Sequence, residues 1–229
     1  MIDMQNTIHR RGFLGSIAKG AAAVGLGSLA GPLALGSTPP DPPLKPSDNA
    51  FEAWLDKING KHKQVFDATS WNNGMPMAWA RVFLMSNGDA GVAATDVSAV
   101  IILRHEAIPL AMEDKLWVKY KFGEAFKIND SGTKAPAVRN GFWQPKEGEL
   151  PLPGMSIDQL QKDGVMFGVC NMALTFYSMK FGKDMNMEAA DVKKDWVAGL
   201  LPGIQIVPSG VYAVNRTQEK GCTYCFAGG

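Results

Sequence analysis

The sequence predicts an α/β protein with a mainly parallel sheet of about five strands and helices on both faces of the sheet. Two observations carry this prediction. Short apolar runs alternate along the chain with longer stretches of helical periodicity, and this alternation is typical of parallel sheets. The run DVSAVIILRH at 96–105 is also nearly continuous in apolar and β-branched residues, as expected for a strand buried on both faces.

The elements of the first half follow in order. The run KQVFDAT at 63–69 is expected to form the first strand. MAWARVFLMSNG at 77–88 has helical spacing and is expected to end at Gly88. The strand at 96–105 comes next, and a further helix is expected to begin within 107–120.

The second half repeats the alternation with three more strands. The expected order is helix 156–164, strand 165–170, helix 171–182, helix 188–201, strand 203–208, helix 209–221 and strand 222–227. Ser156 and Ser209 are the expected N-caps of the first and last of these helices, and Gly164 is the expected stop of the first.

Residues 122–155 break this alternation, because they are rich in glycine, proline and aromatic residues. So long an irregular segment in a compact domain suggests a lid, a binding loop or an oligomer contact. The segment from Lys115 to Lys146 contains seven basic residues but only two acidic ones, Glu124 and Asp130. This excess of positive charge could attract an anion. A solvated loop is the alternative interpretation.

The N-terminal segment HRRGFLGSIAKGAAAVGLGSLAGPLALGS resembles a twin-arginine export signal, with Arg10 and Arg11 placed before Phe13 and Leu14. Its many glycines and an internal lysine make a poor membrane-spanning helix. Residues 1–36 are therefore expected to be a signal peptide that directs the protein to the periplasm, and no other membrane association is expected. The periplasm is an oxidising compartment, which matters for the three cysteines.

Composition limits the remaining possibilities. The chain has 229 residues, of which 46% are hydrophobic and 20% are charged, as expected for a globular domain with one core. The formal net charge is only +1, so the chain does not produce the broad positive field that nucleic-acid binding needs, and no nucleic-acid role is expected. Residues 37–50 are proline-rich and are expected to form a linker, which leaves 51–229 as a single domain.

Candidate site residues are expected where strands end, because open parallel sheets bind ligands beyond the carboxyl ends of their strands. The residues at these ends are Ser70 and Trp71, His105 and Glu106, Cys170 and Asn171, and Pro208, Ser209 and Gly210.

Cys170 ends a predicted strand and directly precedes a predicted helix, where free backbone N–H groups favour a thiolate. Such a sulfur could carry a persulfide, although cysteine is also a common buried residue without function. His105 could approach Cys170 as a base if their strands are neighbours, or it could be a structural hydrogen-bonding residue. The turn at Ser209 and Gly210 could hold an anion, or simply cap a helix.

The motif Cys222-Thr-Tyr-Cys225 invites a thioredoxin-like interpretation in an exported protein. Thioredoxin-like chemistry places this motif at a helix N-terminus, whereas here it lies in a predicted strand. Residues three apart on a strand point to opposite faces, with Cα atoms roughly 10 Å apart. We therefore expect no disulfide between Cys222 and Cys225.

Two stretches, GVMFGVCNMAL at 164–174 and LLPGIQIVPSGVYAVNRTQEKGCTYC at 200–225, resemble the DsrE/DsrF-like family of sulfur-relay proteins. The resemblance implies a flavodoxin-like fold and assembly into trimers or hexamers. It also implies that Cys170 accepts and passes on sulfane sulfur as a persulfide. Characterised sulfur-oxidation members are cytoplasmic and lack both an export signal and an insertion like 122–155.

The sequence thus predicts an exported DsrE-like protein in which Cys170 binds or relays sulfane sulfur. His105 is expected beside it, Asn171, Ser209, Gly210 and Ser70 are expected to bind the ligand, and 122–155 is expected to cover the site. A sulfur donor or acceptor protein, or a small sulfur compound, is the expected partner, with no cofactor and no metal. The alternatives are a non-catalytic ligand-binding or assembly module, and a metal- or haem-associated periplasmic redox protein.

Overall fold

The computed structural model describes residues 48–228. The predicted signal peptide at 1–36 lies outside the described residues, as does most of the predicted linker at 37–50. The first described element, helix α2 (Asp48–Leu55), begins inside the range that was expected to be linker. The folded part of the chain therefore starts three residues before the predicted domain boundary.

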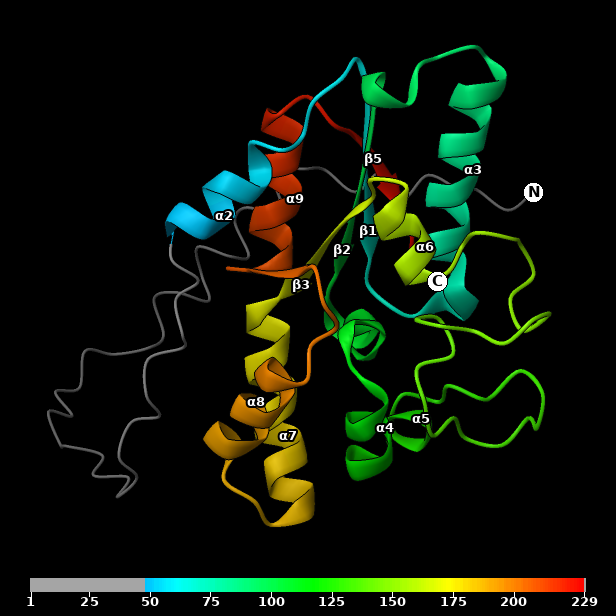
Figure 1. Cartoon of the computed structure of the whole chain (residues 1–229). Coiled ribbons are helices and arrows are strands. Elements are labelled where there is room, and N and C mark those ends of the chain that lie inside the picture. The colour runs from blue at the N-terminus through cyan, green and yellow to red at the C-terminus, as the bar shows by residue number, and fades with distance from the viewer. Residues whose placement is uncertain (1–47, 229) are drawn as a thin grey trace, which may run out of the picture. The chain divides into compact units, whose positions relative to one another are not determined.

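Five parallel strands form one sheet, which confirms the predicted fold class and is consistent with a flavodoxin-like fold (Figure 1). Their order across the sheet is β4-β3-β2-β1-β5. The strands are β1 (His62–Ala68), β2 (Val97–Leu103), β3 (Met166–Cys170), β4 (Ile204–Val207) and β5 (Thr223–Phe226).

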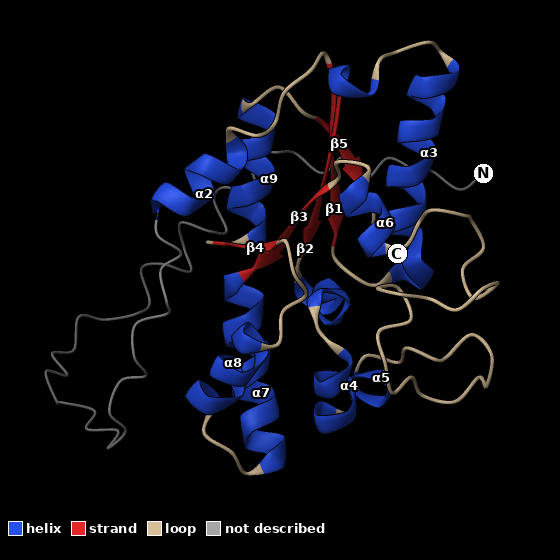
Figure 2. Ribbon diagram, viewed as in Figure 1, coloured by secondary structure: helices blue, strands red, loops and turns tan. Residues whose placement is uncertain are grey.

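Helices cover both faces of the sheet (Figure 2). On one face α2 packs against β4, while α9 (Gly210–Glu219) packs across β1, β2 and β3. On the other face α3 (Met75–Asp89) packs against β1 and β2, and α6 (Ile157–Lys162) packs against α3.

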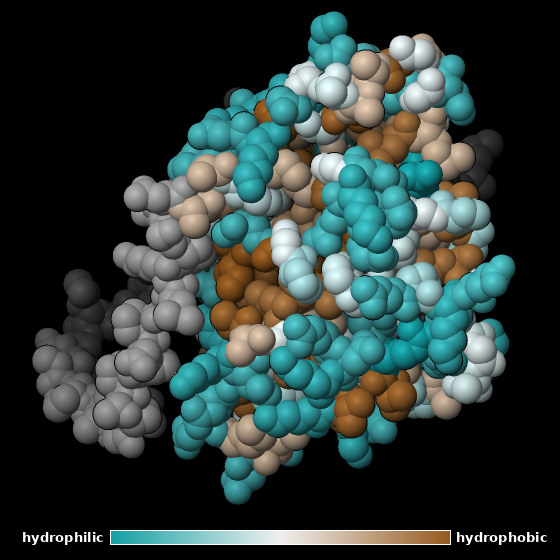
Figure 3. Space-filling view, in the orientation of Figure 1, coloured by the Kyte–Doolittle hydropathy of each residue, from teal (hydrophilic) through white to brown (hydrophobic). Residues whose placement is uncertain are grey.

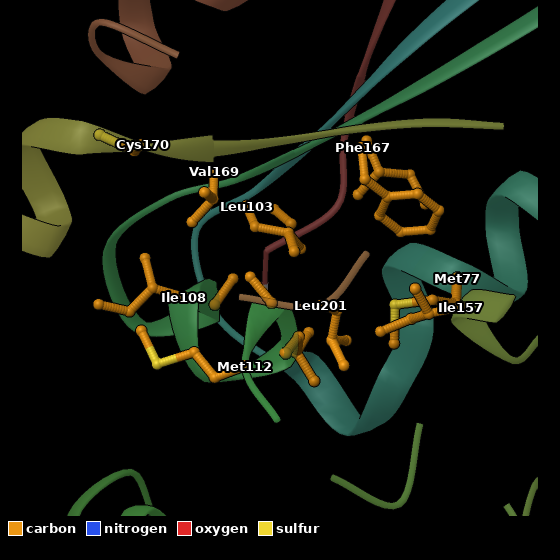
Figure 4. Close-up of a cluster of buried hydrophobic side chains, with 14 of the residues drawn as sticks. Met77, Leu103, Ile108, Met112, Ile157, Phe167, Val169, Cys170 and Leu201 are labelled. Atoms are coloured by element: carbon orange, nitrogen blue, oxygen red, sulfur yellow. The ribbon is translucent and has the colours of Figure 1, made fainter. Parts of the chain in front are cut away.

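The two-sided burial follows from the composition of the central strand β2. Val100 and Ile102 belong to the apolar cluster beneath α2 and α9, whereas Ile101 and Leu103 belong to the larger cluster on the other face. Figure 4 shows part of this larger cluster, with Leu103 among the side chains gathered below strand β3. Successive strand residues point to opposite faces, so a continuous apolar run can serve two cores.

Further helices, from one turn to four turns long, lie beyond the carboxyl ends of the strands (Figure 1). They are η3 (His105–Ala111), α4 (Asp114–Tyr120), α5 (Phe122–Ala125), α7 (Asn171–Met185) and α8 (Ala189–Ala198). Edge-to-face contacts among Tyr120, Phe122, Phe181 and Trp196 join α4, α5, α7 and α8. This second apolar layer covers much of the edge where sequence reasoning placed the ligand.

Some elements differ from the expectation in detail. The helix expected within 107–120 is two elements, a 3₁₀ segment that contains Pro109 and the α-helix α4. Proline interrupts a regular helix because it has no N–H to donate. Ser156 occupies the N-cap position of α6, but its hydroxyl donates to Asp158 instead of accepting from the backbone. Beyond α5, the insertion at 122–155 is irregular, as predicted.

The path of the chain has one reversal. From β1 to β4 the chain moves one strand at a time toward one edge, and after α9 it returns to place β5 beside β1. Strands β1 and β5 therefore flank the topological switch point, the position at which open α/β sheets most often bind ligands.

Candidate functional site

The sheet brings some of the predicted site residues together and keeps others apart. Strands β3 and β4 are neighbours, with Cys170 paired to Val207, so Cys170 lies beside the turn that contains Ser209 and Gly210. Ser70 follows β1, which is separated from β3 by β2. The predicted residues are thus spread along the carboxyl edge, with one compact group at the ends of β3 and β4.

Cys170 is the N-cap residue of α7, as its position in the sequence predicted. Its Sγ accepts a hydrogen bond from the backbone N–H of Ala173 at 3.3 Å and another from the N–H of Gly210 at 3.1 Å. Gly210 is the first residue of α9. The N-termini of two helices therefore converge on one sulfur atom, and both supply N–H groups that have no partner within their own helix.

The Cys170 side chain is closed off from solvent, with an exposed fraction of 5%. Figure 4 shows Cys170 at the end of β3, next to Val169, and its side chain belongs to the same apolar cluster as Val169 and Phe167. Asn171, the first residue of α7, is also buried. The sequence left open whether this sulfur is accessible or buried, and in the structure it is buried beneath the start of α9.

Arg104 lies beside this sulfur, although sequence analysis did not select it. A β-carbon added at Gly210 would lie only 2.5 Å from Cδ of Arg104, so the arginine stem runs directly over that glycine. The guanidinium is bound by both carboxylate oxygens of Asp67, at 2.6 and 2.8 Å. This hydrogen-bonded pair raises the pKa of Arg104, and the nearby Cys170 adds to the effect.

Asp67 fixes the orientation of that guanidinium. Its carboxylate is 3% exposed and also accepts a hydrogen bond from the Tyr224 hydroxyl at 2.9 Å. A buried bidentate pair of this kind holds arginine in one rotamer. The sequence did contain a signal, because Asp67 is the one acidic residue in the apolar middle of the first predicted strand.

His105 does not contact Cys170. Within residues 48–228 no hydrogen bond joins the two side chains, and His105 Nδ1 lies 3.0 Å from the Tyr177 hydroxyl instead. His105 is exposed and has a left-handed φ of +53°, and its ring packs edge-on against Tyr177 of α7, with ring centroids 5.9 Å apart. Burial raises the pKa of Tyr177, as does the negative charge of Glu106. The described residues therefore show no hydrogen bond between the thiol and the imidazole, and His105 is paired with Tyr177 instead.

Ser209 acts as predicted, because its hydroxyl accepts a hydrogen bond from the N–H of Tyr212 at 3.2 Å and so caps α9. This cap fixes the first turn of the helix, including the N–H of Gly210 that reaches the Cys170 sulfur. Ser209 thus positions a contact to the sulfur, although its own hydroxyl is used by the helix.

Cys222 and Cys225 are free thiols on opposite faces of the sheet. Cys222 packs in the cluster beneath α2 and α9, and Cys225 packs against the other cluster. Burial raises the pKa of Cys222 to about 11 and also raises the pKa of Cys225. The prediction that this motif forms no disulfide is confirmed.

The insertion lines a cavity of its own. The cavity has a volume of about 480 Å³ and is lined by insertion residues from Lys127 to Pro151 together with Trp71 and Asn73 from the segment after β1. Cys170 does not line it. The insertion therefore encloses a space near the end of β1, while the start of α9 covers the sulfur.

Two further properties of the described residues bear on function. Among residues 48–228, no group of three or more histidine, cysteine, aspartate or glutamate side chains could hold a metal ion. None of the helices in this part of the chain has the length and apolar character that crossing a membrane requires.

Comparisons with known proteins add little. No model of a protein family matches the chain, and no curated protein matches it. Among solved structures, a protein of unknown function from Methanobacterium thermoautotrophicum is similar at 14% identity and a TM-score of 0.39. The alignment covers 72% of this chain and 98% of that one. The fold assignment therefore rests on the sheet and helices described above, and the resemblance to DsrE/DsrF-like proteins stays a prediction from sequence.

Proposed function

We propose that this chain is an exported DsrE-like protein that binds or relays sulfane sulfur through Cys170. The observation that carries the proposal is the pair of backbone hydrogen bonds from Ala173 and Gly210 to the Cys170 sulfur. Two helix N-termini directed at one atom stabilise negative charge there, which a nucleophilic thiolate requires. Sequence resemblance around Cys170 and around the Ser209 turn supports the same function.

The reaction is an exchange between two sulfur compounds and needs no other reactant. The Cys170 thiolate attacks the outer sulfur of a donor persulfide, R–S–SH. A new S–S bond forms, the S–S bond of the donor breaks, and its electron pair leaves with the thiolate R–S⁻. Cys170 then carries the sulfur as a persulfide, and an acceptor thiolate removes it by the same step in reverse.

Other residues of the chain have supporting roles in this proposal. The Arg104 guanidinium adds positive charge near the sulfur, and Asp67 with Tyr224 holds it in place. Ser209 fixes the first turn of α9 and hence the N–H of Gly210. Because so little of Cys170 is exposed, a donor reaches the sulfur only when the turn before α9 moves aside.

Mass spectrometry after incubation with a low-molecular-weight persulfide tests the proposal. We expect an adduct of about 32 Da, the mass of one sulfur atom, on the peptide that contains Cys170. Cys222→Ser and Cys225→Ser are the matched controls, because they remove the other two thiols and should leave the adduct unchanged. An adduct confined to Cys222 or Cys225, or no adduct at all, would contradict the proposal.

Export by the twin-arginine route is the second part of the proposal and rests on Arg10 and Arg11 in the sequence. Replacing both with lysine should leave the full-length protein in the cytoplasm, because the pathway reads the arginine pair. Cell fractionation measures the result. Unchanged export of the doubly substituted chain would show that another signal is used.

A non-catalytic assembly module is the second candidate function. Strand β4 is an edge strand whose Ile204 and Ile206 are only half-buried, and Figure 3 shows apolar side chains at the surface where Figure 2 places β4. On α7, Met172 and Phe176 are more than half exposed. A homo-oligomer that buries these surfaces should appear by sedimentation, and it should persist in Cys170→Ser.

A further inference from the structure

We propose that the cavity between the insertion and the end of β1 binds a small amphipathic carboxylate. The apolar part of the ligand would lie against Trp71, Phe142 and Ile128, and its carboxylate would bind Lys127. This site is separate from the Cys170 corner and goes beyond the sulfur chemistry proposed there. The inference rests on the position of the cavity, the rigidity of its walls and the unequal use of its charges.

The cavity lies at a favourable position in the fold. Trp71 and Asn73 belong to the connection that leaves the carboxyl end of β1, and β1 is one of the two strands that flank the switch point. Between them, Asn72 donates a side-chain hydrogen bond to the carbonyl of Ala227, just after β5, at 3.3 Å. This bond ties the connection after β1 to the end of β5, and the cavity lies beside that connection, under the insertion.

One wall of the cavity is fixed by close packing. A β-carbon added at Gly74 would lie 2.5 Å from the ring of Phe142, so this ring rests directly on the backbone before α3. The carbonyl of Phe142 accepts a hydrogen bond from the N–H of Ile157 at 2.7 Å, where α6 begins. Trp71 packs beside Phe142, with ring centroids 6.3 Å apart. The aromatic wall formed by Trp71 and Phe142 is thus fixed by the backbone before α3 and by the start of α6.

The opposite wall is a small hairpin within the insertion. Backbone hydrogen bonds of 2.8 Å join Ala137 to Ile128 and Asp130 to Ala135. Gly123 of α5 packs against the backbone of Ala137 so closely that a β-carbon there would overlap it. The hairpin therefore cannot shift toward the core, and the cavity is preformed. Preformed sites bind with a smaller loss of conformational freedom.

The charges that line the cavity are not all engaged. Arg139 forms an ion pair with Glu149. The Asp130 carboxylate accepts three hydrogen bonds from its own turn, and the Lys134 ammonium donates to a carbonyl of that turn. Lys127 is the lining cation whose side chain has neither an ion pair nor a hydrogen bond within residues 48–228. An anionic group is therefore the expected partner of Lys127.

The volume and the mixed walls define the class of ligand. A cavity of about 480 Å³ falls in the range of small-molecule sites, which combine apolar walls with few polar groups. Ile128, Phe142 and Leu150 supply apolar surface, and the indole N–H of Trp71 forms no hydrogen bond within the described residues. One cation beside aromatic walls suits a ring or short chain that carries a single carboxylate.

Calorimetric titration of the full chain with 2-naphthoate and with neutral 2-naphthamide tests the charge preference. We expect 2-naphthoate to bind about fivefold more tightly, because an exposed ion pair contributes up to about that much. Lys127→Gln should abolish the difference. Lys121→Gln is the matched control, since Lys121 has the same left-handed backbone, with φ of +50° against +54°, and does not line the cavity.

Nuclear magnetic resonance of the six tryptophan indole N–H groups tests the location. The resonance that disappears in Trp71→Phe should shift on addition of 2-naphthoate, while the indole resonance of buried Trp117 should not. The proposal is overturned if neither probe binds, if both bind equally well, or if the shifted resonances exclude Trp71. None of these outcomes depends on whether Cys170 accepts sulfur.

Discussion

The Cys170 corner and the insertion cavity lie at the same edge of the sheet, yet they are built in opposite ways. The corner has a nucleophilic atom, two backbone donors and a fixed arginine, but almost no exposed surface. The cavity has space, aromatic walls and a lysine with an unused ammonium group, but no cysteine among its lining residues. The nucleophilic thiol and the cavity with space for a ligand are therefore separated by the width of two strands.

The difference follows from what covers each strand end. At β3 and β4 the next helices begin at once, so their N-termini close over the sulfur and supply its hydrogen bonds. At β1 the chain makes irregular turns before α3, and the insertion folds against them without filling the space. Covering the sulfur excludes water and strengthens its electrostatic contacts, but it also restricts the entry of a ligand. The open cavity admits a ligand more easily, but electrostatic contacts within it are weaker.

Two glycine substitutions should damage the two regions separately and with the largest effects. Gly74→Ala forces a β-carbon against Phe142 at a φ of +81° and should lower the free energy of unfolding by about 3–4 kcal/mol. Gly210→Ala forces one against Arg104 and should lower it by about 2–3 kcal/mol. Urea unfolding measures both changes.

The two glycine substitutions should also affect ligand binding and sulfur loading independently. Gly74→Ala should weaken 2-naphthoate binding and spare sulfur loading on Cys170, and Gly210→Ala should do the opposite. Gly88→Ala is the control, because a β-carbon there meets nothing within 4 Å and should stabilise helix α3 by about 0.5–1 kcal/mol. If both damaging variants impaired both activities equally, the two regions would be one site.

Cys222 is a buried thiol that accepts no hydrogen bond from a helix N-terminus in the described part of the chain, so its pH dependence can be contrasted with the environment of Cys170. Burial raises the pKa of Cys222 from 9.0 to about 11, so the unfolded chain loses this proton at lower pH than the folded one. The stability that this thiol contributes is therefore complete below pH 9 and decreases as the pH rises toward 11. The loss should be about 2–3 kcal/mol.

Unfolding free energies of the wild type and Cys222→Ala, measured between pH 8 and 11, isolate this contribution. Other groups titrate equally in both proteins, so the difference between the two curves belongs to Cys222. Parallel curves would show that the thiol is not held in its neutral form.

The smallest expected effect concerns the two hydrogen bonds to Cys170. Cys170→Ala leaves the N–H groups of Ala173 and Gly210 without an acceptor and should cost about 1–2 kcal/mol. Cys170→Ser keeps an acceptor at the N-cap and should cost less. Thermal or urea unfolding of the two variants provides the measurement, and equal losses would mean that the hydrogen bonds contribute nothing.

Short-range sequence patterns correctly predict those parts of the structure that local rules decide. The β-branched run of β2, the Ser209 cap and the placement of Cys170 at a strand–helix junction all follow from local rules. The opposite faces of Cys222 and Cys225 follow from the alternation of a strand.

The environment of the sulfur could not be predicted in the same way. Its exposure depends on how α9 packs after β4, and the Arg104 contact depends on a glycine 106 positions later in the chain. His105 has a left-handed backbone conformation, and no neighbouring residue in the sequence predicts that conformation. The cavity depends on an insertion without periodicity, so only its irregular character and its basic residues were visible in the sequence.

In the proposed function, Cys170 accepts sulfur in the folded protein although its side chain is buried. The most direct test is the rate of persulfide loading at Cys170 as urea increases to concentrations well below the unfolding midpoint. A local opening of the turn before α9 exposes little surface, so we expect a loading rate that changes only slightly with urea. Cys222 provides the internal comparison, because its modification should rise steeply with global unfolding. A Cys170 rate that rises as steeply as that of Cys222 would contradict the claim.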